Sequence, residues 1–283
     1  MWSFELGELV EIDPTQLAPA TDVDRCFLAL ALLFNDLKDL VIIDVWLEGQ
    51  RPEQDKPRPY AGQWAGIANH VRRLGASLLH EFLQLLKKHN ELIGSEEFQS
   101  LVQQTPRWAQ DAWKEFLLLA QAADDDSAKR SPLYRALRDI RNWSAFHYAQ
   151  WKPLANAYRT FFIAENKDPG SSYAFVSMGK DMDAIRFYYA DAAASSLARV
   201  LSEREQLDVQ ERVNDTMRQL NRALAPVISA YLRQKTNNLV PVCWASEEDA
   251  ARDYRGLRAR GGRPRDRAKS KAERAARRRR RVR

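Results

Sequence analysis

Apolar side chains recur at spacings of three and four residues through most of the chain, which is the pattern of amphipathic helices. It predicts long helices over residues 22–47, 64–90 and 208–235, and shorter ones over 95–103, 105–122, 131–151, 153–165 and 191–202. The helix over 105–122 is expected to pack through Trp108, Ala112, Phe116 and Leu119. The most regular apolar stripe belongs to residues 208–235 and comprises Val209, Val213, Met217, Leu220, Leu224, Val227 and Tyr231. Pro226 lies inside this helix and should kink or divide it.

Polar residues and turn formers set the ends of these elements. Asp22, Ser131 and Asp191 are the expected N-caps. Residues 49–62 hold three prolines and mixed charge, which predicts a surface loop or linker. The β-branched and aromatic runs at 173–177 and 184–189 flank a Gly-Lys-Asp turn and predict a small β-hairpin. The fold class is therefore mostly α, with one helical domain over residues 1–251.

The helix over residues 131–151 changes character along its length. Its first apolar stripe, Leu133, Leu137 and Ile140, continues into Ser144, His147 and Trp151. A neighbouring stripe carries Arg138, Arg141 and Tyr148. A stripe that begins apolar and then turns to hydroxyl, imidazole and guanidinium groups indicates a packed helix whose far end lines a polar site.

Residues 140–148 read Ile-Arg-Asn-Trp-Ser-Ala-Phe-His-Tyr. This string resembles the Arg-x(4–6)-His signature of the HEPN superfamily, with Arg141 and His147 as its two ends. Members of that family are four-helix bundles, and many are metal-independent endoribonucleases of toxin–antitoxin, abortive-infection and CRISPR systems. Their composite active sites lie at dimer interfaces. The resemblance implies a HEPN-like up-and-down bundle, a homodimer, RNA as substrate, an antitoxin protein as a partner, and a role in phage (antiviral) defence.

The chemistry of these residues suits phosphodiester cleavage. His147 can transfer a proton near neutral pH as general acid or base. Arg141 can brace the phosphoryl oxygens, and Asn142 can orient the substrate or the histidine. RNA supplies its own nucleophile in the 2′-OH, so neither a metal nor another cofactor is required. Arg138, Ser144 and Tyr148 are candidate substrate-binding residues.

The spacing of Arg141 and His147 restricts how they can cooperate. On a regular helix, six residues separate two side chains by about 120° around the axis and about 9 Å along it. One straight helix therefore cannot aim both groups at one small substrate atom. Either the end of the helix distorts, or a second copy of the chain supplies the partner group across a two-fold axis.

Structural interpretations of the same residues stay open. Arg141 and His147 can form a purely structural pair, in which case the chain is a non-enzymatic nucleic-acid-binding or regulatory helical protein. His70, His80 and His89 are expected to be solvated or singly bonded. His80-Glu81 does not begin a metalloprotease motif, because Gln84 stands where the second histidine is needed. Residues 124–126, three consecutive aspartates, are interpreted as a polar connection, so no metal site is predicted.

Charge divides the chain into two parts. The formal net charge is +6, but residues 252–283 carry 16 Lys and Arg against three acids, which leaves the preceding part acidic. This composition predicts a disordered C-terminal tail that binds nucleic acid without sequence preference. Its expected phosphate contacts are Arg263, Arg265, Arg277, Arg278, Arg279, Arg280 and Arg281.

The cellular compartment is predicted from the cysteines, the first residues and the longest apolar run. Cys26 and Cys243 give neither a disulfide framework nor a metal-ligand spacing. The first residues do not form a signal peptide, and the longest apolar run is too short to span a bilayer. The sequence predicts a cytoplasmic protein without a membrane segment.

Overall fold

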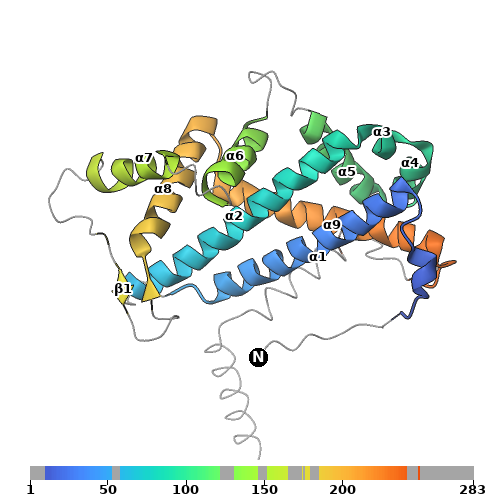
Figure 1. Ribbon diagram of the computed structural model, residues 1–283, viewed down its shortest axis with the longest axis horizontal. Coiled ribbons are helices and arrows are strands. Elements are labelled where there is room, and N and C mark those ends of the chain that lie inside the picture. The colour runs from blue at the N-terminus through green and yellow to red at the C-terminus, as the bar shows by residue number, and fades with distance from the viewer. Residues whose placement is uncertain are drawn as a thin grey trace, which may run out of the picture. The chain divides into compact units, whose positions relative to one another are not determined.

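The computed structural model describes residues 10–52, 58–121, 131–145, 152–164, 174, 176–178, 185–240 and 248, without the side chains of 58, 59, 144, 145 and 164. Its elements, drawn in Figure 1, are the 3₁₀ turn η1 (Pro14–Leu17), α1 (Asp22–Gly49), α2 (Arg58–Lys88), α3 (Asn90–Gly94), α4 (Glu96–Gln103), α5 (Arg107–Gln121), α6 (Pro132–Ile140), the π turn η2 (Arg141–Ala145), α7 (Lys152–Arg159), the π turn η3 (Thr160–Ala164), β1 (Ser177–Met178), β2 (Ile185–Arg186), α8 (Tyr188–Glu205) and α9 (Val209–Lys235). The fold is mostly α with one small antiparallel sheet among the described residues, as the sequence predicted.

The chain divides into two compact units. The first comprises residues 1–38, 81–131 and 216–250, and the second comprises 39–80, 132–215 and 251–283. Helices α1, α2 and α9 each contribute residues to both units. The expected boundary between residues 251 and 252 falls outside the described residues, so the predicted single domain and its tail stay predictions.

The first unit is built around stacked aromatic rings. The ring of Phe27 lies 4.3 Å from that of Tyr231 and 5.1 Å from that of Phe98, and Phe98 in turn stacks on Trp113 at 5.7 Å. The buried face of α5 is Ala109, Trp113, Phe116 and Ala120. Of the four residues predicted to pack, only Phe116 is buried, and Trp108, Ala112 and Leu119 are half-buried. The helix is rotated so that Trp113, not Trp108, enters the aromatic stack.

A polar cluster joins the first turn of α1 to the end of α9 in the same unit. Thr21 caps α1, because its hydroxyl accepts the N–H of Asp24 while its own N–H donates to the Asp24 carboxylate. Asp22 was predicted as this cap, so that prediction was wrong by one residue. The buried Asp24 also accepts from the Tyr231 hydroxyl at 3.0 Å and pairs with Lys235 at 2.6 Å. Burial alone would raise the pKa of Asp24, but the hydrogen bonds from Lys235, Thr21 and Tyr231 outweigh it and lower the pKa.

In the second unit α8 packs against both α6 and α7, and it also lies against the N-terminal half of α2 (Figure 1). Helix α2 begins at Arg58 and not near Trp64, so the predicted loop is shorter than expected. Two glycines lie in the N-terminal part of this helix, at residues 62 and 66. A Cβ at Gly62 would come within 2.6 Å of the Tyr188 ring, and a Cβ at Gly66 would overlap the Arg186 guanidinium. Both glycines allow the chain around residues 186–188 to approach α2 closely.

The predicted hairpin exists, but its strands are short. Ser177 pairs with Arg186 and Met178 with Ile185 in antiparallel register. Helix α8 starts at Tyr188, so the prediction of a strand through residue 189 and of an N-cap at Asp191 was wrong. The carboxylate of Asp191 instead accepts a hydrogen bond from Arg186 Nε at 2.8 Å. That ion pair fixes the turn from β2 into α8.

The last long helix agrees with its sequence pattern. All seven residues of the predicted α9 stripe are buried, and Asp208 caps the helix by accepting the N–H of Glu211. The helix continues through Pro226, so it is not divided there. Among the described residues, no helix is both long and apolar enough to cross a membrane.

Candidate functional site

The helix that carries the Arg-Asn-Trp segment changes geometry at Arg141. Helix α6 ends at Ile140, and residues Arg141–Ala145 form the π turn η2. A π-helix bonds each N–H to the carbonyl five residues back, and single π turns occur frequently at functional sites. The regular step of about 100° per residue does not hold across this turn. Of the two arrangements that the spacing allowed, the distorted helix end is present, and pairing of two chains stays a prediction.

The structure places some of the predicted site residues and brings two of them together. Nη1 of Arg141 donates to Oδ1 of Asn142 at 3.2 Å, and both side chains are half-buried. Ser144 lies within η2, but its side chain is outside the described part. His147, Tyr148 and the tail arginines at 263, 265 and 277–281 also lie outside the described residues.

Arg138 does not contact Arg141 or Asn142 through any described hydrogen bond; it pairs with its neighbour Asp139. Two guanidinium nitrogens of Arg138 approach Oδ1 of Asp139 at 2.9 and 3.0 Å. Oδ2 of the same carboxylate accepts from Arg204 Nη2 at 2.6 Å. The carboxylate is almost fully buried, whereas the Arg138 side chain is about one-third exposed. The partly exposed Arg138 is therefore held in place by a buried acid, Asp139, which the sequence interpretation did not include.

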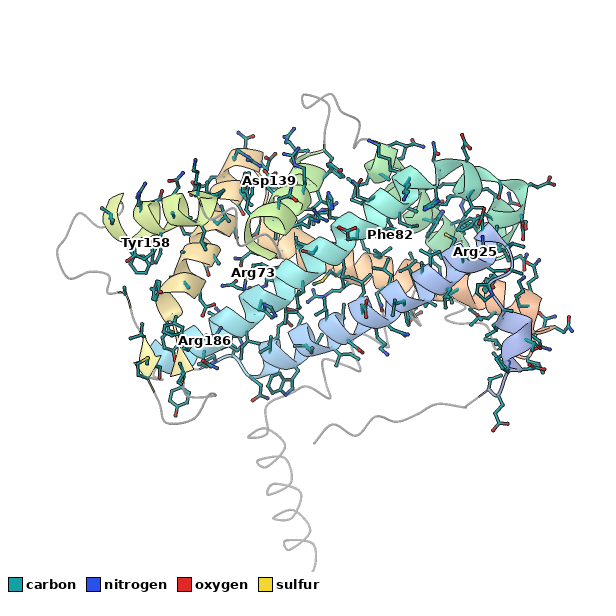
Figure 2. The ribbon with its side chains drawn as sticks, viewed as in Figure 1. Arg25, Arg73, Phe82, Asp139, Tyr158 and Arg186 are labelled. Carbon is teal, nitrogen blue, oxygen red and sulfur yellow. The ribbon has the colours of Figure 1, made fainter. Side chains whose placement is uncertain are left out.

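The pairing continues through a second buried acid. Arg204 Nε donates to Glu205 Oε1 at 2.7 Å, and Arg135 Nε donates to Glu205 Oε2 at 2.8 Å. We refer to Arg138, Asp139, Arg204, Glu205 and Arg135 as the ion-pair chain; its α6 and α8 segments are visible beside the labelled Asp139 in Figure 2. It holds three guanidinium groups and two carboxylates, so it carries one excess positive charge.

The carboxylates of the ion-pair chain are buried, and its guanidinium groups are partly exposed. The side chains of Asp139 and Glu205 are 3% and 1% exposed, whereas that of Arg204 is 44% exposed. Burial alone would raise the pKa of Glu205, but the hydrogen bonds from Arg135 and Arg204 outweigh it and lower the pKa. Partial burial opposes the charged form of Arg204, yet its bonds to Asp139 and Glu205 raise its pKa. The surface presented to solvent is therefore an organised array of guanidinium groups.

Trp143 connects this array to the π turn. The Arg204 guanidinium lies over the Trp143 ring, 5.7 Å from the ring centre, in a cation–π contact. Trp143 is the residue after the Arg141–Asn142 pair, in the middle of η2. The ion-pair chain and the turn that bears Arg141 are thus one continuous feature. A guanidinium array of this kind can bind the oxygens of a phosphate backbone.

Sequence interpretation missed Asp139, Trp143, Arg204 and Glu205. A signal for Asp139 existed, because Arg135, Arg138 and Asp139 occupy one face of a helix at spacings of three and four. An acid on a basic face indicates a pairing role. No comparable signal marked Arg204 and Glu205, because adjacent opposite charges at the end of a helix are common on solvated surfaces.

The three described histidines differ in their surroundings. His80 is buried, with its ring 5.6 Å from that of Tyr134, so of the two expectations, solvated or singly bonded, burial excludes the first and leaves the second open. His89 is exposed. His70 is exposed. Partial removal from water and the charges of Arg73 and Arg186 lower its pKa, and the charge of Asp191 acts in the opposite direction. Within the described ranges, no group of three His, Cys, Asp or Glu side chains could hold a metal ion.

Cys26 is buried, and burial raises the pKa of its thiol to about 11, so it is a weak nucleophile. Cys243 and the aspartates at 124–126 are outside the described residues.

Comparison with known proteins yields no relative: no protein-family model, no curated protein and no solved structure matches the chain. The resemblance to the HEPN superfamily therefore rests on the residues of the signature alone.

Proposed function

We propose that the chain is a HEPN-like, metal-independent endoribonuclease that cleaves RNA by attack of the 2′-OH. The observation that carries the proposal is the hydrogen-bonded Arg141–Asn142 pair at the start of a π turn, directly beside the ion-pair chain. A π turn holds Arg141 and Asn142 in a geometry that a regular helix does not provide. The neighbouring guanidinium array favours a polyanionic substrate.

Each residue of the signature has a role in this proposal. Arg141 clamps the phosphoryl oxygens as charge develops on them, and Asn142 orients Arg141 by accepting its N–H at 3.2 Å. His147 transfers protons to and from the ribose and leaving-group oxygens. Arg138 and Arg204 bind flanking phosphates, while Ser144 and Tyr148 contact the substrate nearer the scissile bond. The 2′-OH attacks the adjacent phosphorus, the 5′-oxygen leaves with a proton, and a 2′,3′-cyclic phosphate forms.

The proposal extends to the partners that the family resemblance implies. RNA is the substrate, a second copy of the chain completes a homodimer, and an antitoxin protein restrains the activity in the setting of phage defence. Residues 252–283, rich in Arg and Lys, add sequence-independent affinity for nucleic acid. We place the protein in the cytoplasm.

A second function is favoured by one specific observation. Arg138, Arg204 and Arg135 are all held by buried carboxylates, which is the arrangement of a rigid binding surface. A non-catalytic protein that binds or regulates nucleic acid would use the same array, with Arg141 and His147 as a structural pair.

Cleavage assays with point variants separate the two functions. Purified full-length protein is incubated with total RNA in EDTA, and the rate of cleavage is measured for wild type, Arg141→Ala, Asn142→Ala and His147→Ala. The Arg141 and His147 variants should lose about 10²–10³-fold in rate, as expected for removal of one transition-state donor or one acid–base group. Arg107→Ala, which removes a guanidinium that is 75% exposed on α5, is the matched control and should retain full activity. RNA binding without cleavage by the wild type would favour the non-catalytic function.

A further inference from the structure

A small pocket lies within the second unit, where α2, α8 and α9 meet. Asn69, Arg72 and Arg73 line it from one face of α2, at spacings of three and four residues. Gln210 of α9 adds a fourth polar side chain. Ala198 of α8 also lines the pocket, and its small side chain leaves space where a longer one would close it. The cavity measures about 30 Å³, which excludes a nucleobase and suits one compact group.

The charged side chains that line the pocket are both cationic. Arg72 and Arg73 are its charged lining residues, and no carboxylate lines it among the described residues. The pKa of His70 is lowered, first by partial removal from water and then by the charges of Arg73 and Arg186. This shift is consistent with a positive potential in this region. The pocket therefore favours an anion.

Arg72 also has a donor without a described acceptor. Its Nη1 reaches Gln210 Oε1 at 3.4 Å, which is a long hydrogen bond, and its buried Nε has no hydrogen-bond partner among the described residues. A buried donor left in this state is unfavourable, because it has lost its hydrogen bonds to water without gaining others. An oxyanion in the pocket would satisfy Nε and would accept from the amide of Gln210, whose carbonyl oxygen already faces Arg72.

We propose that this pocket binds a single phosphate group, contributed either by a free nucleotide or by the backbone of RNA. Arginine forks match the tetrahedral oxygens of phosphate and can bind two of them at once. The apolar wall formed by Leu197 and Val213 lies against the same pocket, so it can contact the carbon skeleton next to the phosphate. Ile140 also lines the pocket and immediately precedes Arg141, so the ligand would bind beside the π turn. The proposal does not depend on ribonuclease activity. Figure 2 labels Arg73 on α2.

Calorimetric titration of the full-length protein with inorganic phosphate, at constant ionic strength, tests the pocket. Wild type should bind one phosphate saturably, and both Arg72→Gln and Ala198→Leu should weaken binding about tenfold or more, which is about 1.4 kcal/mol. Arg212→Gln removes an exposed charge from α9 two residues beyond Gln210, and it should change the affinity less than twofold. Equal affinities in all four proteins would show that phosphate binds elsewhere and would overturn the proposal, as would absence of binding to wild type.

The Ala198→Leu variant guards against a folding defect. It fills the pocket but retains both arginines, so it decides the outcome if circular dichroism shows that Arg72→Gln is unfolded. Loss of binding in a folded Ala198→Leu protein supports the site, and full binding overturns it.

Two further ligands identify the source of the phosphate. Adenosine monophosphate and a 2′-O-methyl oligoribonucleotide without terminal phosphates, which cannot be cleaved by 2′-OH attack, are titrated into wild type and Arg72→Gln. A selective loss of monophosphate affinity indicates a free nucleotide, and a loss of oligonucleotide affinity indicates the RNA backbone. If neither affinity changes, the pocket is not a phosphate site. Because none of these ligands is cleaved, this result is independent of the cleavage assays with Arg141 and His147 variants.

Discussion

Glu205→Gln is the substitution that most directly perturbs the ion-pair chain. The Glu205 carboxylate is 1% exposed and receives hydrogen bonds from Arg135 at 2.8 Å and from Arg204 at 2.7 Å. Glutamine keeps the shape of the side chain and one acceptor oxygen, but it removes the charge and turns an N–H₂ group toward a guanidinium. The variant leaves two cations over a buried amide.

The magnitude follows from the burial of the partners. Removing one member of a buried ion pair typically costs about 3–5 kcal/mol, because the remaining charge is left buried and uncompensated. Here the Arg135 and Arg204 side chains are 29% and 44% exposed, so both can turn partly toward water. We therefore expect a loss in unfolding free energy at or below the lower end of that range, about 2–3 kcal/mol at pH 7.

The dependence on pH gives a second check. The pKa of Glu205 is lowered in the folded protein, so its contribution is present above the ordinary glutamate pKa and is lost as the pH falls through the folded value. The difference in unfolding free energy between wild type and Glu205→Gln should therefore be largest near neutral pH and shrink below about pH 4.

Urea denaturation monitored by circular dichroism, at several pH values, measures both quantities. Glu203→Gln is the matched control, because it makes the same change at an exposed position of α8 two residues away. It should alter the unfolding free energy by less than about 0.5 kcal/mol. Equal losses in the two variants, or a difference that does not vary with pH, would refute the assigned role of Glu205.

Three further expectations concern the assembly, the tail and the packing of α2. The inactive Arg141→Ala and His147→Ala proteins are mixed under conditions where native mass spectrometry shows subunit exchange. If the two groups come from different chains, each heterodimer has one intact site of two and should recover up to about half of the wild-type cleavage. Without recovery, one chain supplies both groups. Deleting residues 259–283 should weaken binding of nucleic acid and flatten its salt dependence in fluorescence anisotropy, whereas an unchanged slope would mean that the tail makes few phosphate contacts. Gly62→Ala should cost about 1–3 kcal/mol in thermal denaturation, because a Cβ there would come within 2.6 Å of the Tyr188 ring, while Gly94→Ala, which meets nothing within 4 Å, should cost far less; similar losses would contradict the proposed packing.

The long helices could be predicted from sequence because their apolar stripes are unambiguous. In α9 each residue of the stripe is buried, and an aspartate caps the start of the helix. Helix α5 shows the limit of this reasoning, because Trp108 and Trp113 lie on neighbouring faces of one aromatic-rich helix. Only the stacking of Trp113 on Phe98 selects between the two faces, and that contact is a property of the folded chain.

The candidate site was predictable in its residue types but not in its geometry. The basic and polar residues around Arg141 were evident from the sequence, but the hydrogen bond between the Arg141 and Asn142 side chains was not. The π turn was not evident, because a shift from i−4 to i−5 hydrogen bonding leaves no periodic mark in five residues. The burial of Glu205 was also not evident, because it depends on the packing of α8 against α6. Its partner Arg135 in α6 lies 70 positions earlier in the sequence.

The chemical form of the RNA ends tests the central claim most directly. A defined, unstructured RNA is incubated with the full-length protein in EDTA, and the product ends are identified by mass spectrometry. Cleavage by 2′-OH attack with proton transfer by His147 predicts 2′,3′-cyclic phosphate or 3′-phosphate ends, their absence with His147→Ala, and no cleavage of the all-2′-deoxy analogue. Ends that carry a 3′-hydroxyl, or cleavage that requires an added divalent ion, would contradict the account.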